Sequence, residues 1–171
     1  MEFMLLLVDR KDSPPADPTA TAELGRFTED LRQQGKLKAT VLLRPAPTGA
    51  RVEVREGKAV VTDGSFAGGT ESVAGSLVVE VASRAEAIEI AKRCPHARAG
   101  TVEVRLVPDR DVARVAAPTT FMFLLHMDPD LEDADGAKYR EMVAYDETLK
   151  REGKYVESSQ LALDPPAARV E

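Results

Sequence analysis

The sequence lacks the features that mark several common classes of protein. Its 171 residues include one cysteine, Cys94, so no disulfide can form within the chain, and this favours a reducing compartment. No run of about 18 consecutive apolar residues is present, as a spanning helix would require. The first residues have neither the positive region nor the long apolar stretch of a signal peptide. We therefore expect a soluble, cytoplasmic protein with no membrane partner.

Positive charge and metal-binding patterns are also scarce. The chain has 23 Lys and Arg against 29 Asp and Glu, a net charge of −6. A surface that neutralises phosphates needs clustered basic residues, so we expect no nucleic-acid partner. No His/Cys cluster suggests zinc. The acidic run 128–135 lacks the Gly and the terminal Glu of a calcium-binding loop, and a solvated lead-in to a helix explains it. We expect no cofactor.

What the sequence does have is a regular succession of apolar segments and turns, with 43% apolar residues to build a core. Periodicity and capping residues predict these elements in order: strand 3–8, a helix from Pro18 that ends at Gly35, strand 37–43, a hairpin of 51–55 and 58–62, strand 76–81, a helix capped by Ser83 and Glu86 that runs to Cys94, and strand 101–107. This order predicts the α+β class. We expect a ferredoxin-like βαββαβ module with an added hairpin and both helices on one face of the sheet.

The chain also contains an internal repeat. At a shift of 118 residues, segment 3–53 aligns without gaps on 121–171, and 18 of the 51 aligned positions are identical. A register held over that length indicates duplication. The chain is therefore predicted to comprise a complete module at 1–108, a linker at 109–119 and a truncated second copy at 120–171, which is a βαβ half-module.

The half copy has an apolar face but lacks the second half that would cover it. Fully burying one large apolar side chain is worth roughly 1.5–3 kcal/mol, and a large exposed apolar patch invites aggregation. We therefore expect strand 121–126 to pair with, or pack on, the sheet of a complete module. A homodimer that shares halves is favoured, and docking within one chain is the alternative.

Four short segments resemble one known family. They are Val60–Ala67, with its Asp-Gly-Ser-Phe core, the opening Phe3–Leu7, the helix end Leu31–Gly35, and Gly100–Arg105. In this order they resemble the YCII-related family, in the DGPF-type branch named for an Asp-Gly-Pro-Phe segment. The sequence departs from that branch at Ser65, where the branch has Pro, and at Val41, where a Glu is common. The resemblance implies a dimeric α/β-barrel with a cleft beside each sheet, and a His–Asp pair in the cleft, of which only the Asp carries over, to Asp63.

Asp63 is the best candidate for chemistry. A carboxylate on a tight Gly-containing loop beside Phe66 could have a raised pKa and act as a general base or acid. The alternative is that Asp63 accepts hydrogen bonds from loop N–H groups and holds the turn, as Asp-Gly pairs commonly do. Phe66, Arg51 and Arg105 are candidates for binding a ligand. The two arginines could meet an anionic ligand, although surface ion pairs explain them equally well.

Two histidines are weaker candidates. His126 ends the first strand of the half copy, with Asp128 or Asp130 as a partner, and a buried, hydrogen-bonded histidine is the commoner outcome. His96 follows Pro95 in a loop, where we expect it to be solvated. Three functions remain open: a small-molecule enzyme that uses Asp63, a module that binds an apolar or anionic metabolite without turnover, and an assembly protein.

Overall fold

The computed structural model describes residues 1–10, 18–55, 57–64, 70–112, 120–125, 136–162 and 166–170. The chain divides into two compact units. Unit 1 comprises Met1–Pro108 together with Gln160–Glu171, and unit 2 comprises Asp109–Ser159. The first boundary falls at the predicted end of the complete module, and the last twelve residues of the predicted half copy group with unit 1.

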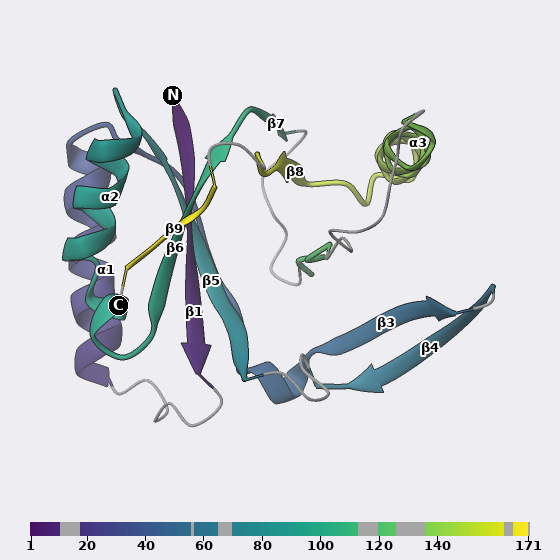
Figure 1. Ribbon diagram of the computed structural model, residues 1–171, viewed down its shortest axis with the longest axis horizontal. Coiled ribbons are helices and arrows are strands. Elements are labelled where there is room, and N and C mark those ends of the chain that lie inside the picture. The colour runs from purple at the N-terminus through teal and green to yellow at the C-terminus, as the bar shows by residue number, and fades with distance from the viewer. Residues whose placement is uncertain are drawn as a thin grey trace. The chain divides into compact units, whose positions relative to one another are not determined.

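Unit 1 is built on a five-stranded sheet in the order β2-β5-β1-β6-β9, in which every neighbouring pair is antiparallel. The strands are β1 (Glu2–Arg10), β2 (Leu37–Leu42), β5 (Glu71–Glu80), β6 (Thr101–Val107) and β9 (Ala168–Val170). Helices α1 (Pro18–Gln33) and α2 (Arg84–Arg93) lie on the same face of this sheet (Figure 1). Helices beside an antiparallel sheet define the α+β class, as predicted.

The core lies between the sheet and the two helices. Successive residues of a strand point to opposite faces, so alternate residues of the central strands face the helices. These inward residues and the helix residues that meet them form one buried cluster: Phe3, Leu5, Leu7, Leu31, Leu77, Val79, Val81, Ala87, Ile90, Ala91, Cys94, Val102 and Val104. The intervening residues of the central strands lie on the other face, which carries neither α1 nor α2 and which we call the helix-free face for that reason.

Local signals set the ends of both helices. Helix α1 begins at Pro18, and its C-terminal turn is closed by Gly35, whose φ of 69° is accessible to glycine without strain. Helix α2 has the predicted cap, in which the N–H of Glu86 donates to Ser83 Oγ at 3.2 Å. The reciprocal bond is displaced by one residue, because Glu86 Oε2 accepts from the N–H of Ala82 at 3.0 Å. Glu86 also pairs with Lys36 at 3.0 Å, and these contacts hold the pKa of its carboxyl below the usual value, the Lys36 bond most strongly.

The predicted hairpin forms a separate two-stranded sheet of β3 (Ala50–Arg55) and β4 (Lys58–Asp63), preceded by the short 3-10 helix η1 (Ala46–Thr48). Gly57, with φ of 74°, lies in its turn. Strand β5 begins at Glu71, five residues before the predicted start at 76. Its Gly75 explains the extension, because a Cβ there would collide with the carbonyl oxygen of Val41, so the missing side chain lets β2 approach.

Unit 2 contains the helix α3 (Ala137–Arg151) and a two-stranded sheet of β7 (Asp109–Val112) and β8 (Glu157–Gln160). The predicted linker at 109–119 therefore begins with a strand. Polar contacts join β7 to the chain around α3 and β8: Lys150 Nζ lies 2.7 Å from Asp111 Oδ2, and Arg110 Nη1 lies 3.4 Å from Glu157 Oε2. No helix in the described part of the chain is long and apolar enough to cross a membrane.

The strand predicted at 121–126 is absent from residues 120–125, which have no regular secondary structure. Phe121, Phe123 and Leu125 are 80%, 65% and 70% exposed. In the first module, β1 lies between β5 and β6, and both neighbours provide its ladder hydrogen bonds.

Candidate functional site

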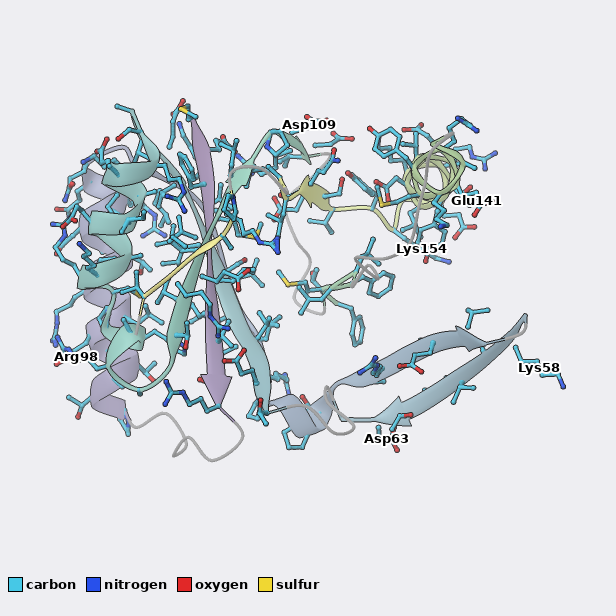
Figure 2. The ribbon with its side chains drawn as sticks, viewed as in Figure 1. Lys58, Asp63, Arg98, Asp109, Glu141 and Lys154 are labelled. Carbon is cyan, nitrogen blue, oxygen red and sulfur yellow. The ribbon has the colours of Figure 1, made fainter. Side chains whose placement is uncertain are left out.

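Asp63 is the last residue of β4, and its side chain is exposed. It pairs with Ala50 across the hairpin. The turn beyond it is closed by the backbone, because the N–H of Gly64 donates to the carbonyl oxygen of Gly49 at 2.8 Å. Among the described residues, no group forms a hydrogen bond or ion pair with the Asp63 carboxylate. Figure 2 shows Asp63 at one end of β4 and Lys58 at the other.

Arg51 belongs to the same hairpin but does not share a face with Asp63. Arg51 pairs with Thr62, and Asp63 pairs with Ala50, so alternation directs the two side chains to opposite faces. Its guanidinium lies 2.5 Å from Glu53 Oε1. The ion pair that the sequence left as an alternative is therefore present.

Arg105 lies on the helix-free face of the five-stranded sheet. It stands opposite Met4 of β1, and its side chain is 27% exposed. Its Nε donates to Glu103 Oε1 at 3.0 Å, so the predicted alternative of an ion pair also holds here. Within the described part of the chain, the Nη groups of Arg105 make no hydrogen bond. They are therefore able to donate to an anionic ligand in the bidentate manner typical of arginine.

A second polar site was not predicted from the sequence. The imidazole Nε2 of His96 lies 3.1 Å from the carbonyl oxygen of Val8 and 3.6 Å from Asp9 Oδ1. His96 belongs to the 3-10 helix η2 (Pro95–Arg98), and its side chain is 14% exposed, so the expectation of a solvated histidine was wrong. Gly100 makes room for the ring, because a Cβ there would lie 2.7 Å from Nε2.

The geometry around His96 is that of a structural clamp. With its Nε2–H donated to the Val8 carbonyl, the ring joins η2 to β1 between residues that are 88 positions apart along the chain. Arg98, also in η2, pairs with Glu23 of α1 at 2.7 Å. Because Asp9 is 47% exposed, its charge is well solvated and orients the imidazole only weakly. No periodicity joins residues 9 and 96, so only the strand order brings them together.

The remaining predicted site residues lie outside the described residues. They are Phe66, His126, and the partners Asp128 and Asp130 suggested for that histidine. Asp63, Arg51 and Arg105 are described, and the structure does not bring them into contact. The single thiol, Cys94, is 1% exposed, and burial raises its pKa, which makes it a poor nucleophile. Among the described residues, no three His, Cys, Asp or Glu side chains are grouped as ligands for a metal ion.

The fold and these residues define an α+β protein with an antiparallel sheet, both helices on one face, and polar groups on a hairpin and on the helix-free face. Comparison with models of protein families shows which family the chain belongs to. The YCII-related domain matches residues 1–110. The chain therefore belongs to the YCII-related family. A search of curated proteins found no match to this chain.

Proposed function

We propose that this protein is a DGPF-type member of the YCII-related family that binds a small molecule and uses the Asp63 carboxylate for acid–base chemistry on it. Its first module would be ferredoxin-like. Supporting this fold are the order β2-β5-β1-β6 and the two helices on one face. Supporting the site is the position of Asp63 directly before Gly64 in the Asp-Gly-Ser-Phe segment on which the resemblance rests.

The observation that carries the proposal is that, among the described residues, the exposed Asp63 carboxylate accepts no hydrogen bond. If its role were to hold the turn, its oxygens would accept from loop N–H groups. Of the neighbouring N–H groups that the structure describes, that of Gly64 donates to Gly49 instead. The carboxylate is thus exposed on a hairpin fixed by six paired positions, and it is available to take a proton from a bound substrate and return it.

Anionic small molecules are the ligand class that the remaining candidates favour. Arg105 offers its Nη groups on the helix-free face, and Arg51 is exposed on the hairpin. Phe66, three residues after Asp63, is proposed as an apolar contact for the ligand. His126 stays a weaker proposal for a second acid–base group.

Substitution of Asp63 tests the proposal. We expect Asp63→Asn to lower kcat by at least about a hundredfold on any substrate identified in a screen of small carboxylates and phosphates, with an unchanged melting temperature. The matched control is Lys58→Ala at the other end of β4, which should leave turnover unaltered. If Asp63 holds the turn instead, Asp63→Asn should cost about 1 kcal/mol of stability. A destabilised but fully active variant would reject the catalytic role.

Assembly is the second function, and a specific observation favours it. In the segment proposed to be a truncated second copy, four apolar side chains are at least half exposed: Phe121, Phe123, Leu125 and Tyr145. Such residues favour association, so we propose a homodimer that covers them. The full chain should then sediment at twice 18.5 kDa, and the double variant Phe121→Asp with Phe123→Asp should sediment at the monomer mass. A monomeric full chain would exclude this dimer.

A further inference from the structure

The outer edge of β6 is covered by a very short strand. All seven residues of β6 pair with β1 on one side, from Thr101 opposite Val8 to Val107 opposite Glu2. On the other side, β9 pairs only with Val102–Val104. Without β9, β6 would present a row of unpaired N–H and C=O groups, which is a template for the addition of another strand.

In addition to its ladder with β6, the segment that contains β9 is fastened by polar contacts. The N–H of Ala162 donates to the carbonyl oxygen of Leu106 at 2.9 Å, and Arg84 Nη2 donates to that of Pro166 at 2.9 Å. The third contact is an ion pair of 2.6 Å between Arg169 Nη2 and Glu71 Oε1. These contacts add to the ladder positions Val102–Val104 and to the apolar contacts of Ala168 and Val170.

The ion pair of Arg169 fixes the register of β9. It lies on one face of the sheet, and the apolar contacts of β9 lie on the other face. Ala168 and Val170 pack against the core cluster. Arg169 stands opposite Glu103, so its side chain lies on the helix-free face. Because β1 and β6 separate β9 from β5 in the sheet, the bond to Glu71 reaches across two strands. Both partners are well solvated, at 42% and 40% exposure, so the pair selects register more than it adds stability.

We propose that the outer edge of β6 is a strand-addition site whose occupant is the Ala168–Val170 strand of a second copy of this chain, with the chain's own β9 as its intramolecular competitor. The recognition elements are the ladder positions Val102–Val104, the apolar contacts of residues 168 and 170, and the charge pair of Arg169 with Glu71. Because β9 pairs at three positions and competes at the effective concentration that its own chain connection sets, an equivalent strand supplied at high concentration exchanges with it.

This inference does not rest on the proposed role of Asp63 or on the dimer proposed above. That dimer uses the exposed apolar residues of segment 120–125, whereas strand exchange uses β6 and β9. The two are separated by introducing Phe121→Asp and Phe123→Asp into every chain used in the test, because these exposed positions lie outside the β6–β9 ladder.

Complementary charge reversal provides the test. In the Arg169→Glu variant, residues 169 and 71 are both acidic, and in the Glu71→Arg variant both are basic. These two residues therefore repel each other within one chain and between two copies of the same variant. When the two variants are mixed, each strand meets an opposite charge on the other chain. We expect the mixture to form a heterodimer of twice 18.5 kDa, with an association constant at least about tenfold above that of either variant alone, measured by analytical ultracentrifugation.

The matched control is a mixture of Lys38→Glu with Glu80→Lys, which reverses the charges of an ion pair between β2 and β5, away from β6. It should not associate. Hydrogen exchange of the backbone amides of residues 102–104 should be fast in Arg169→Glu alone and in Glu71→Arg alone, and slow in the mixture of these two variants. A mixture that stays monomeric, or a control mixture that associates equally well, would overturn the proposal.

A peptide of residues 166–171 with a fluorescent label gives a second measurement that does not depend on those variants folding. Titrated onto the full chain that carries only Phe121→Asp and Phe123→Asp, it should bind with a rise in anisotropy and be displaced by the unlabelled peptide. The peptide with Arg169→Glu should bind at least about tenfold more weakly. Absence of binding at millimolar peptide, or equal binding of the two peptides, would contradict strand addition at this edge.

Discussion

Helices α1 and α3 have closely similar local structures but opposite burial. At the shift of 118 residues, α3 (Ala137–Arg151) corresponds to residues 19–33 of α1. Their C-terminal turns use the same bonds: Gly35 and Gly153, with φ of 69° and 65°, are followed by Lys36 and Lys154, whose N–H groups donate to the carbonyl oxygens of Leu31 and Leu149 at 2.9 Å. Yet α1 buries Leu31 to 2% exposure, and α3 has no buried residue.

The difference separates what is local from what depends on the rest of the fold. Helix length and the glycine-closed end follow from the nearby sequence and recur wherever that sequence recurs. Burial depends on the surrounding elements, because Leu31 of α1 lies in a core cluster to which β1, β5, α2 and β6 contribute. A helix with the same C-terminal turn therefore contributes a buried residue to the core in unit 1 and has no buried residue in unit 2.

The largest expected effect on stability distinguishes two phenylalanines that align at the shift of 118 residues. Phe3 is 1% exposed and Phe121 is 80% exposed. We expect Phe3→Ala to lower the free energy of unfolding by about 3–5 kcal/mol, because it leaves a cavity in the core. Phe121→Ala should change it by less than about 0.5 kcal/mol. Chemical denaturation at low protein concentration measures both. Equal losses of unfolding free energy in the two variants would contradict this prediction and show that segment 120–125 is buried in solution.

A smaller effect is expected at the helix N-termini. Ser83 caps α2 with its hydroxyl, whereas α3 begins after Gly136, which makes no side-chain bond. Ser83→Ala should cost about 1 kcal/mol in thermal or chemical denaturation, because the N–H of Glu86 loses its acceptor. Ser83→Gly is the control and should cost only a few tenths of a kcal/mol, on the order found for glycine caps. Loss of the same stability in both variants would contradict a capping role.

The smallest expected effect is the dependence of the stability of unit 2 on pH. A hydrogen bond from Lys150 holds the pKa of the Asp111 carboxyl below its ordinary value. The folded state therefore binds this proton less readily than the unfolded state, so the stabilisation is present above the ordinary pKa of Asp, about 3.9, and is lost as pH falls through the folded-state pKa. In Lys150→Gln the Asp111 carboxyl should titrate at higher pH by NMR. An unchanged titration would contradict the pairing.

Much of unit 1 could be predicted from the sequence, since its signals are local. Strand β6 has its predicted bounds, α1 begins at Pro18, and the hairpin surrounds Gly57. Strand β9 could not be predicted, because Ala-Arg-Val carries no periodicity and becomes a strand only beside β6. The contact of His96 with Asp9 was missed for the same reason, as it depends on strand order. Asp63 was found from a motif, and its function stays a prediction.

The central position of β1 has a consequence for the time course of folding on the ribosome. Residues 2–10 are complete long before their neighbours in the sheet, which are residues 71–80 and 101–107. At synthesis rates of roughly 5–20 residues per second, about 100 further residues take on the order of 5–20 s to emerge. During that interval Phe3, Leu5 and Leu7, which are almost fully buried in the finished protein, have no strand to cover them. Slower translation ahead of residue 107 would lengthen the exposure of these apolar side chains.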